Sequence, residues 1–214
     1  MSLRHHPSEA ILAHYAAGAL ADGPSLVVSA HLERCARCRA EVRLYEGVGG
    51  VLMDALPPAE MDDDALALVL ARIERPPPPP RASTPLRMGP EALDLPRALA
   101  RRGVGPRRFV APGVWTAAVA SNHADGWRTY LLRVPAGAAA PHHDHNGPEF
   151  TVLLRGAYRD DTVPYGEGDF AESGSGDAHH PQATAAGPCI CLISGQGGIK
   201  ASGWVRLLKP LLGV

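Results

Sequence analysis

The most chemically informative residues in the first half of the chain are one histidine and two cysteines. His31, Cys35 and Cys38 form the pattern H-x-x-x-C-x-x-C within a stretch of helical periodicity. Residues three and four apart share a helical face, so the three side chains are expected to converge on a tetrahedral ion. A closed zinc site needs a fourth donor. The local candidates for it are His5, His6 and His14. The alternative is a buried cysteine pair beside a solvated histidine.

A second group of potential ligands lies in the other half, with the spacing G-x5-H-x-H-x3-E-x6-G. His143 and His145 point to one side of a strand, and Glu149 follows across a turn, so all three can face one interior. Downstream, His179 and His180 are both available, and only one of these adjacent residues can point inward. The alternative is a metal-free barrel with core histidines, which would bury these polar groups at a high cost.

Cys189 and Cys191 are the remaining cysteines, and they project from the same face of a predicted strand. Buried inert thiols are the default interpretation, and a redox role stays open. Four cysteines in 214 residues are too few for a disulfide scaffold, which favours metal or redox use in a reducing compartment.

The overall composition excludes several classes of function. The chain has 21 Lys and Arg against 22 Asp and Glu, a net charge of −1, so no basic surface for direct nucleic-acid binding is expected. A DNA-binding regulator is therefore a weak alternative. Neither a membrane span nor a secretion signal is evident, so we expect a soluble cytoplasmic protein without a membrane partner.

Five consecutive prolines, residues 76–80, divide the chain into the two parts that must position these residues. We predict a helical zinc-binding domain over residues 1–75, a proline-rich linker over 76–90 and a β domain over 91–214. In the first, a helix is expected from Ser8 to Leu20, stopped by Asp22-Gly23-Pro24, and a second helix or bent pair from Ser25 to about Leu56. A third helix over residues 61–75 has a broad apolar face, which packs on its own domain or docks onto another protein.

Beyond the linker, the chain alternates short apolar runs with Gly and Pro after a short predicted helix over residues 91–101. The strand candidates are residues 114–120, 127–134, 150–154, 168–172, 189–193 and 204–208. The fold class predicted is two-domain α plus β, with a small all-α zinc-binding bundle followed by an antiparallel β-barrel or sandwich.

Taken together, these motifs resemble the ChrR family of zinc anti-sigma factors over nearly the whole chain. The histidine and glutamate spacing is similar to the first motif of a cupin barrel, although Gly174-Ser175-Gly176-Asp177 replaces the P-x-G expected in the second motif. The resemblance implies zinc in both domains. It also implies two ligand sets, which are His6, His31, Cys35 and Cys38 in the helical domain, and His143, His145, Glu149 and His179 in the cupin.

The resemblance implies a regulator and not an enzyme. Its helical domain would sequester an extracytoplasmic-function (ECF) sigma factor in a 1:1 complex, and its cupin would sense an oxidative signal such as singlet oxygen. One alternative is a cupin metalloenzyme, a dioxygenase or isomerase, with an accessory zinc domain. Another is a redox switch in which Cys35 and Cys38 are themselves the sensor and expel zinc on forming a disulfide.

Overall fold

The computed structural model describes residues 3–76, 86–88, 91–122 and 126–201. Most of the predicted linker and the predicted strand at 204–208 lie outside the described residues. The helices are α1 (Glu9–Ala16), α2 (Asp22–Arg34), α3 (Ala36–Asp54), α4 (Ala65–Ile73) and α5 (Arg97–Ala100). The strands are β1 (Leu86–Met88), β2 (Glu91–Leu93), β3 (Arg108–Ala111), β4 (Val114–Ala118), β5 (Trp127–Val134), β6 (His143–His145), β7 (Glu149–Arg155), β8 (Tyr158–Asp160), β9 (Val163–Tyr165), β10 (Phe170–Ser173), β11 (Pro181–Ala183), β12 (Cys189–Gln196) and β13 (Ile199–Ala201).

Helix α1 begins after Ser8, as predicted, but its end and the start of α2 differ from the sequence prediction. Helix α1 ends at Ala16, because Gly18 turns the chain with a positive φ of 66°. The prediction that Asp22-Gly23-Pro24 stops a helix was wrong, since these residues form the first turn of α2. A proline there loses no helical hydrogen bond, and the aspartate interacts favourably with the helix dipole. The bent pair that was predicted is α2 followed by α3.

The β domain is the predicted antiparallel sandwich. A six-stranded sheet has the order β10-β7-β12-β5-β4-β3, and a three-stranded sheet has the order β11-β8-β9, with the short pairs β13-β6 and β1-β2 beside them. The helix predicted over residues 91–101 was only partly right, because β2 takes its first residues and α5 is four residues long. Pro96 precedes α5 with an extended backbone, which a helix interior does not allow.

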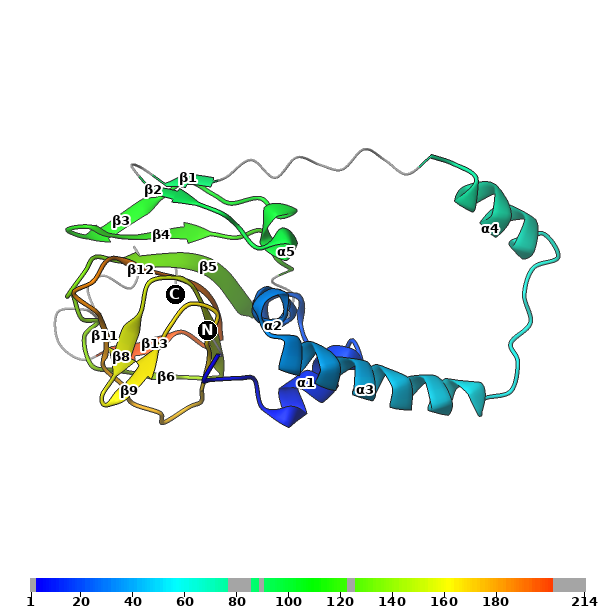
Figure 1. Ribbon diagram of the computed structural model, residues 1–214, viewed down its shortest axis with the longest axis horizontal. Helices are drawn as coiled ribbons and strands as arrows, with labels where there is room; N and C mark the ends of the chain where they lie inside the picture. Colours follow the sequence, from blue (N-terminus) through cyan, green and yellow to red (C-terminus); the bar gives the residue numbers. More distant parts are fainter. Residues whose placement is uncertain (1–2, 77–85, 89–90, 123–125, 202–214) are drawn as a thin grey trace.

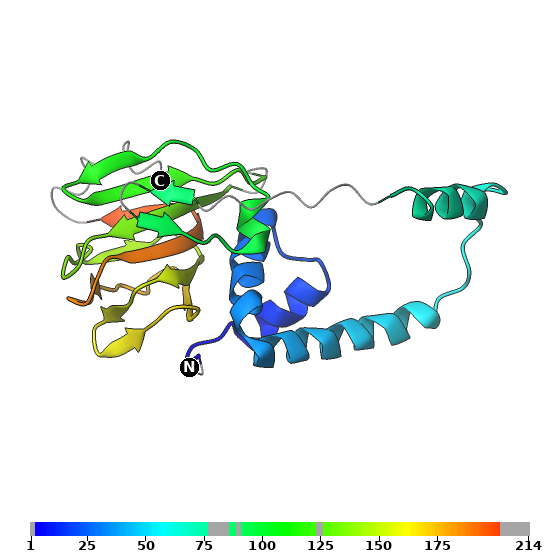
Figure 2. The same cartoon turned by 45° about the horizontal axis from the view of Figure 1, so that its top comes forward.

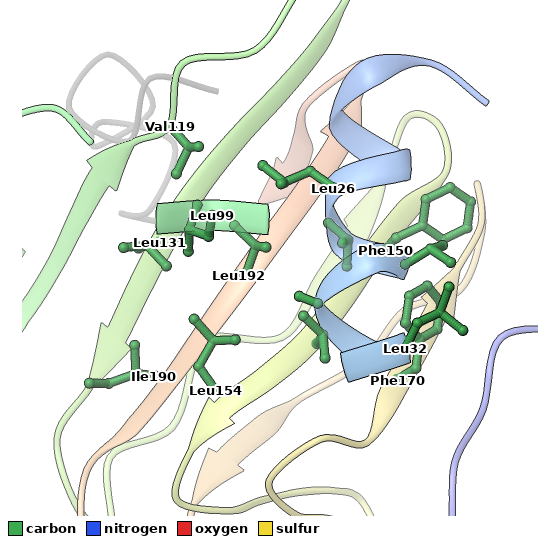
Figure 3. Close-up of a cluster of buried hydrophobic side chains, with 14 of the residues drawn as sticks. Leu26, Leu32, Leu99, Val119, Leu131, Phe150, Leu154, Phe170, Ile190 and Leu192 are labelled. Carbon is green, nitrogen blue, oxygen red and sulfur yellow. The ribbon is translucent and has the colours of Figure 1, made fainter. Parts of the chain in front are cut away.

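Strand β12 is apolar on both faces because both are covered. Ile190 and Leu192 pack in a cluster with residues of α2, α5, β5 and β7. Cys189, Cys191 and Ile193 point the other way, into a second cluster with residues of β8 and β11. Figure 3 shows α2 and the short α5 lying across the strands of the six-stranded sheet. The helical segment and the six-stranded sheet therefore share one hydrophobic core.

Helices α3 and α4 extend away from this core. In Figures 1 and 2, α3 runs outward from the sandwich and α4 stands apart at its far end. None of the residues of α4 is buried in the described structure. Of the helices formed by the described residues, none combines the length and apolar character required to cross a membrane.

Candidate metal centres

The helical domain builds its centre at the break between α2 and α3. His31 lies in the last turn of α2, and Cys35 leaves the helix with φ −108° and ψ 101°. Cys38 follows in the first turn of α3, and its backbone N–H donates to the Cys35 Sγ at 3.4 Å. The three residues thus meet at a bend between two helices, and the expectation of one continuous helical face was wrong.

The N-terminal arm brings a fourth donor to this bend. One ligand atom each from His6, His31, Cys35 and Cys38 lies within 4.8 Å of the others. The His6 Nδ1 is 3.4 Å from the Sγ of both Cys35 and Cys38, and the His31 Nε2 is 3.3 Å from the Cys38 Sγ. A tetrahedral zinc ion separates its nitrogen and sulfur ligands by about 3.3–3.8 Å, so the four donors fit such an ion. His5 lies outside the group and contacts the Tyr165 ring.

Burial favours the uncharged form of both His31 and Cys38. His31 and Cys38 are each 0% exposed. Burial lowers the pKa of His31 to about 4, so its imidazole is neutral and able to act as a ligand. Burial, followed by the hydrogen bond and charge of Cys35, raises the pKa of Cys38 to about 12. A nearby cation is what would convert these buried thiols to thiolates. The donor set suits zinc or another borderline or soft metal ion.

In the β domain, three histidines meet through their Nε2 atoms. The His179 Nε2 lies 2.9 Å from that of His143 and 3.0 Å from that of His145. These three form the group whose ligand atoms lie within 4.8 Å of one another. His180 is outside it, and its backbone N–H donates to the Asp160 carboxylate at 3.1 Å. Of the adjacent pair, the structure thus brings His179 to the centre.

Hydrogen bonds on the opposite ring nitrogens orient two of these imidazoles. The His143 Nδ1 donates to the Pro141 carbonyl at 2.8 Å, and the His179 Nδ1 lies 3.0 Å from the Asp160 carboxylate. With the protons on Nδ1, the Nε2 lone pairs are directed at the common point. Burial lowers the pKa of His143, and burial together with the neighbouring imidazoles lowers that of His145 to about 4. Both shifts favour the neutral imidazole, which is the form that binds a metal.

Glu149 lies beside the histidine group and does not join it. Its Oε2 is 3.6 Å from the Nδ1 of His145, the ring nitrogen that does not face the other histidines. Burial raises the pKa of Glu149 to about 7. The carboxyl lines a cavity of about 340 Å³ together with Arg128 and Tyr130. The structure thus gathers three of the four predicted cupin ligands, and the role of Glu149 as the fourth stays a prediction.

Cys189 and Cys191 are buried and close together. Their Sγ atoms are 3.6 Å apart in the core between the two sheets. The hydrogen bond with Cys189 and burial raise the pKa of Cys191 well above its ordinary value. The Cys191 thiol is therefore protonated, and both side chains are shielded from solvent, as in the default interpretation of an inert buried pair.

Asp160 supports the histidine group, and no motif in the sequence predicted it. Its carboxylate contacts His179 across a separation of 19 residues, a pairing that no local spacing rule contains. The signal that existed was chemical, because histidine ligands usually donate their second ring N–H to a carboxylate or carbonyl.

Comparison with known proteins agrees with this architecture. A family model described as the ChrR cupin-like domain matches residues 106–197. The anti-sigma-E factor ChrR of Cereibacter sphaeroides is 35% identical over 219 residues, covering 98% of both chains. The crystal structure of Rhodobacter sphaeroides SigE in complex with the anti-sigma ChrR matches with 34% identity and a TM-score of 0.74, covering 91% of this chain and 100% of that chain. That relative is an anti-sigma factor and not an enzyme, in agreement with the prediction of a non-catalytic chain. The chain belongs to the ChrR family of anti-sigma factors.

Proposed function

We propose that this chain sequesters an ECF sigma factor in a 1:1 complex in the cytoplasm and releases it when the cupin domain responds to an oxidative signal such as singlet oxygen. The observation that carries the proposal is the apolar surface of α3, α4 and the segment between them. The relative of similar sequence and fold was crystallised bound to SigE, which supports a sigma factor as the partner.

This apolar surface is defined by twelve large hydrophobic residues that are between 51% and 75% exposed. They are Leu44, Val48, Val51, Leu52, Met53, Leu56, Met61, Leu66, Leu68, Val69, Leu70 and Ile73. Large exposed apolar patches are rare on monomeric soluble proteins, so we interpret the exposed residues of α3 and α4 as contact surfaces for a partner. Because α4 stands apart from α3 (Figure 2), the two helices can contact a partner from two sides.

Zinc in the helical domain would have a structural role. It would join the arm at His6 to the bend at Cys35, so that metal binding contributes to the folding of a small domain. The same bend sets the direction in which α3 leaves the core. Loss of the ion would therefore disturb the helices that carry the apolar surface.

Zinc in the cupin, held by His143, His145 and His179 with Glu149 as the predicted fourth ligand, would belong to the sensor. The cavity beside Glu149 gives a small molecule a route to that carboxyl and to His145. Converting nearly complete sequestration to nearly complete release requires about 5.5 kcal/mol of differential binding, or removal of the inhibitor by proteolysis.

The proposal is tested by mixing the purified chain with the ECF sigma factor of its own organism. We expect a 1:1 complex by gel filtration and inhibition of transcription by RNA polymerase. Burying a leucine contributes about 1.5–3 kcal/mol, so Leu66→Glu with Leu70→Glu is expected to weaken the complex by at least about 100-fold. Phe109→Glu is the matched control, because Phe109 is 62% exposed on the cupin, away from this surface.

Two results would count against the proposal. The first is the absence of a complex at micromolar concentrations, and the second is an equal loss of binding in the Phe109→Glu control. Replacing His143 and His179 by alanine in the full chain is expected to abolish the oxidant response while retaining sigma binding. A response that survives these substitutions would favour the redox switch at Cys35 and Cys38.

A further inference from the structure

A turn of the cupin domain touches the metal centre of the helical domain. The His31 Nδ1 donates to the backbone carbonyl of Gly168 at 2.7 Å, and the contact is buried. Because a carbonyl only accepts, it places the imidazole proton on Nδ1 and leaves the Nε2 lone pair facing Cys38. The turn that ends at Asp169 thus selects the tautomer with which His31 can act as a ligand.

The next residue of this turn, Asp169, holds the arm that carries His6. Its side chain is buried, with 4% of the residue exposed. Its Oδ1 accepts the backbone N–H groups of Arg4 at 2.8 Å and His5 at 3.1 Å, and its Oδ2 accepts that of Gly166 at 2.8 Å. One carboxylate therefore joins the arm immediately before His6 to the cupin turn.

Further contacts extend this attachment on both sides of His6. The Phe170 N–H donates to the His5 carbonyl at 3.2 Å, and the Phe170 ring meets His31 edge-on at 5.8 Å. Beyond His6, the Ser8 hydroxyl donates to the Glu172 carboxylate at 3.1 Å. All of these cupin groups belong to β10 or to the turn before it.

Strand β10 also leads to the cupin centre. Its last residue, Ser173, pairs with Glu149 of β7, and Ser175 forms an isolated bridge with His145. A strand of four residues therefore has the ligands of the helical domain at one end and the ligands of the cupin at the other.

We propose that Asp169 and the Gly168 carbonyl are positioning groups for the metal site of the helical domain, so that β10 of the cupin holds His6 and His31 in place. The inference rests on the proposed function, because it requires that His6, His31, Cys35 and Cys38 bind a metal. Outer partners of metal ligands typically contribute 10–100-fold to metal affinity. A shift of β10 in the cupin would then reach the helical domain without passing through the linker.

The test uses the full chain loaded with Co²⁺. Thiolate-to-cobalt charge-transfer absorption reports only the helical centre, because the cupin histidine group contains no sulfur. Asp169→Asn removes the charge and places an N–H donor against backbone N–H groups. We expect it to lower Co²⁺ affinity at the thiolate site by 10–100-fold and to speed amide exchange in residues 3–8. Asp177→Asn is the matched control, since that carboxylate accepts a backbone N–H in a cupin turn away from the arm.

Unchanged cobalt affinity in a folded Asp169→Asn protein would overturn the inference, and so would an equal loss in Asp177→Asn. If Asp169→Asn does not fold, Glu172→Gln weakens the arm at an exposed position and is expected to lower affinity several-fold. Parent-like affinity in that variant would also overturn the inference. A parent protein without the charge-transfer band would refute the metal centre itself, which separates failure of the proposed function from failure of the positioning role.

Discussion

Replacing Gly23 by alanine is expected to weaken the packing of α2 against the six-stranded sheet. A Cβ at this position would lie 2.4 Å from the Oγ of Ser194 and 2.4 Å from the Oγ1 of Thr129. These two hydroxyl groups are buried and lie 3.2 Å from each other, so neither can move away freely. Overpacking of this kind costs typically about 1–3 kcal/mol. For a chain of this length, about 2 kcal/mol lowers Tm by roughly 4–8 °C.

The same substitution at Gly47 is the control. Gly47 lies inside α3 with open space around its Cβ position, so alanine there is expected to stabilise the helix by about 0.5–1 kcal/mol. Thermal unfolding followed by tryptophan fluorescence measures both, since Trp115 is buried in the shared core. A Gly23→Ala protein as stable as the parent would refute the close packing of α2 on the sheet.

Three further predictions concern charge and metal. Burial alone would raise the pKa of Asp22, but hydrogen bonds from Arg102 and a backbone N–H, together with the arginine charge, lower it overall. Asp22→Asn should therefore lower the free energy of unfolding, measured in urea at pH 7, by about 1 kcal/mol. The difference from the parent should vanish as the pH falls below the depressed pKa of Asp22. Removing the metal with a chelator should make Cys35 and Cys38, two of the four buried thiols, reactive towards a thiol reagent. Reactivity of all four thiols would contradict the assignment of Cys189 and Cys191 to a core that does not depend on this metal. Asp160→Asn should weaken metal binding at the cupin histidines by about 10–100-fold in competition with a chelating dye, and unchanged affinity would argue against its contact with His179.

The residue types of both centres could be predicted from the sequence because their spacing is mostly local. His31, Cys35 and Cys38 are close enough along the chain for helical geometry to bring them together, even though a bend replaces the single helix. The choice of His6 over its neighbours could not come from spacing, because it depends on how Asp169 holds the arm.

The elements were predictable where the periodicity was long, as in β5, which covers the predicted residues 127–134. The strands of three residues, such as β6 and β8, carry too few positions to show an alternation. The packing of α2 against the six-stranded sheet was also not predictable, since the apolar residues of a helix do not specify which surface they cover. The sequence left open whether the apolar face of α4 packs on its own domain. The structure shows that it does not, because none of the residues of α4 is buried.

The central claim is that α3 and α4 hold the sigma factor, and hydrogen–deuterium exchange of the chain with and without that partner tests it most directly. We predict strong protection of residues 44–56 and 61–75 in the complex, with the exposed face of β3 around Phe109 unchanged. Protection confined to the cupin, with α4 exchanging as fast as in the free chain, would contradict the account.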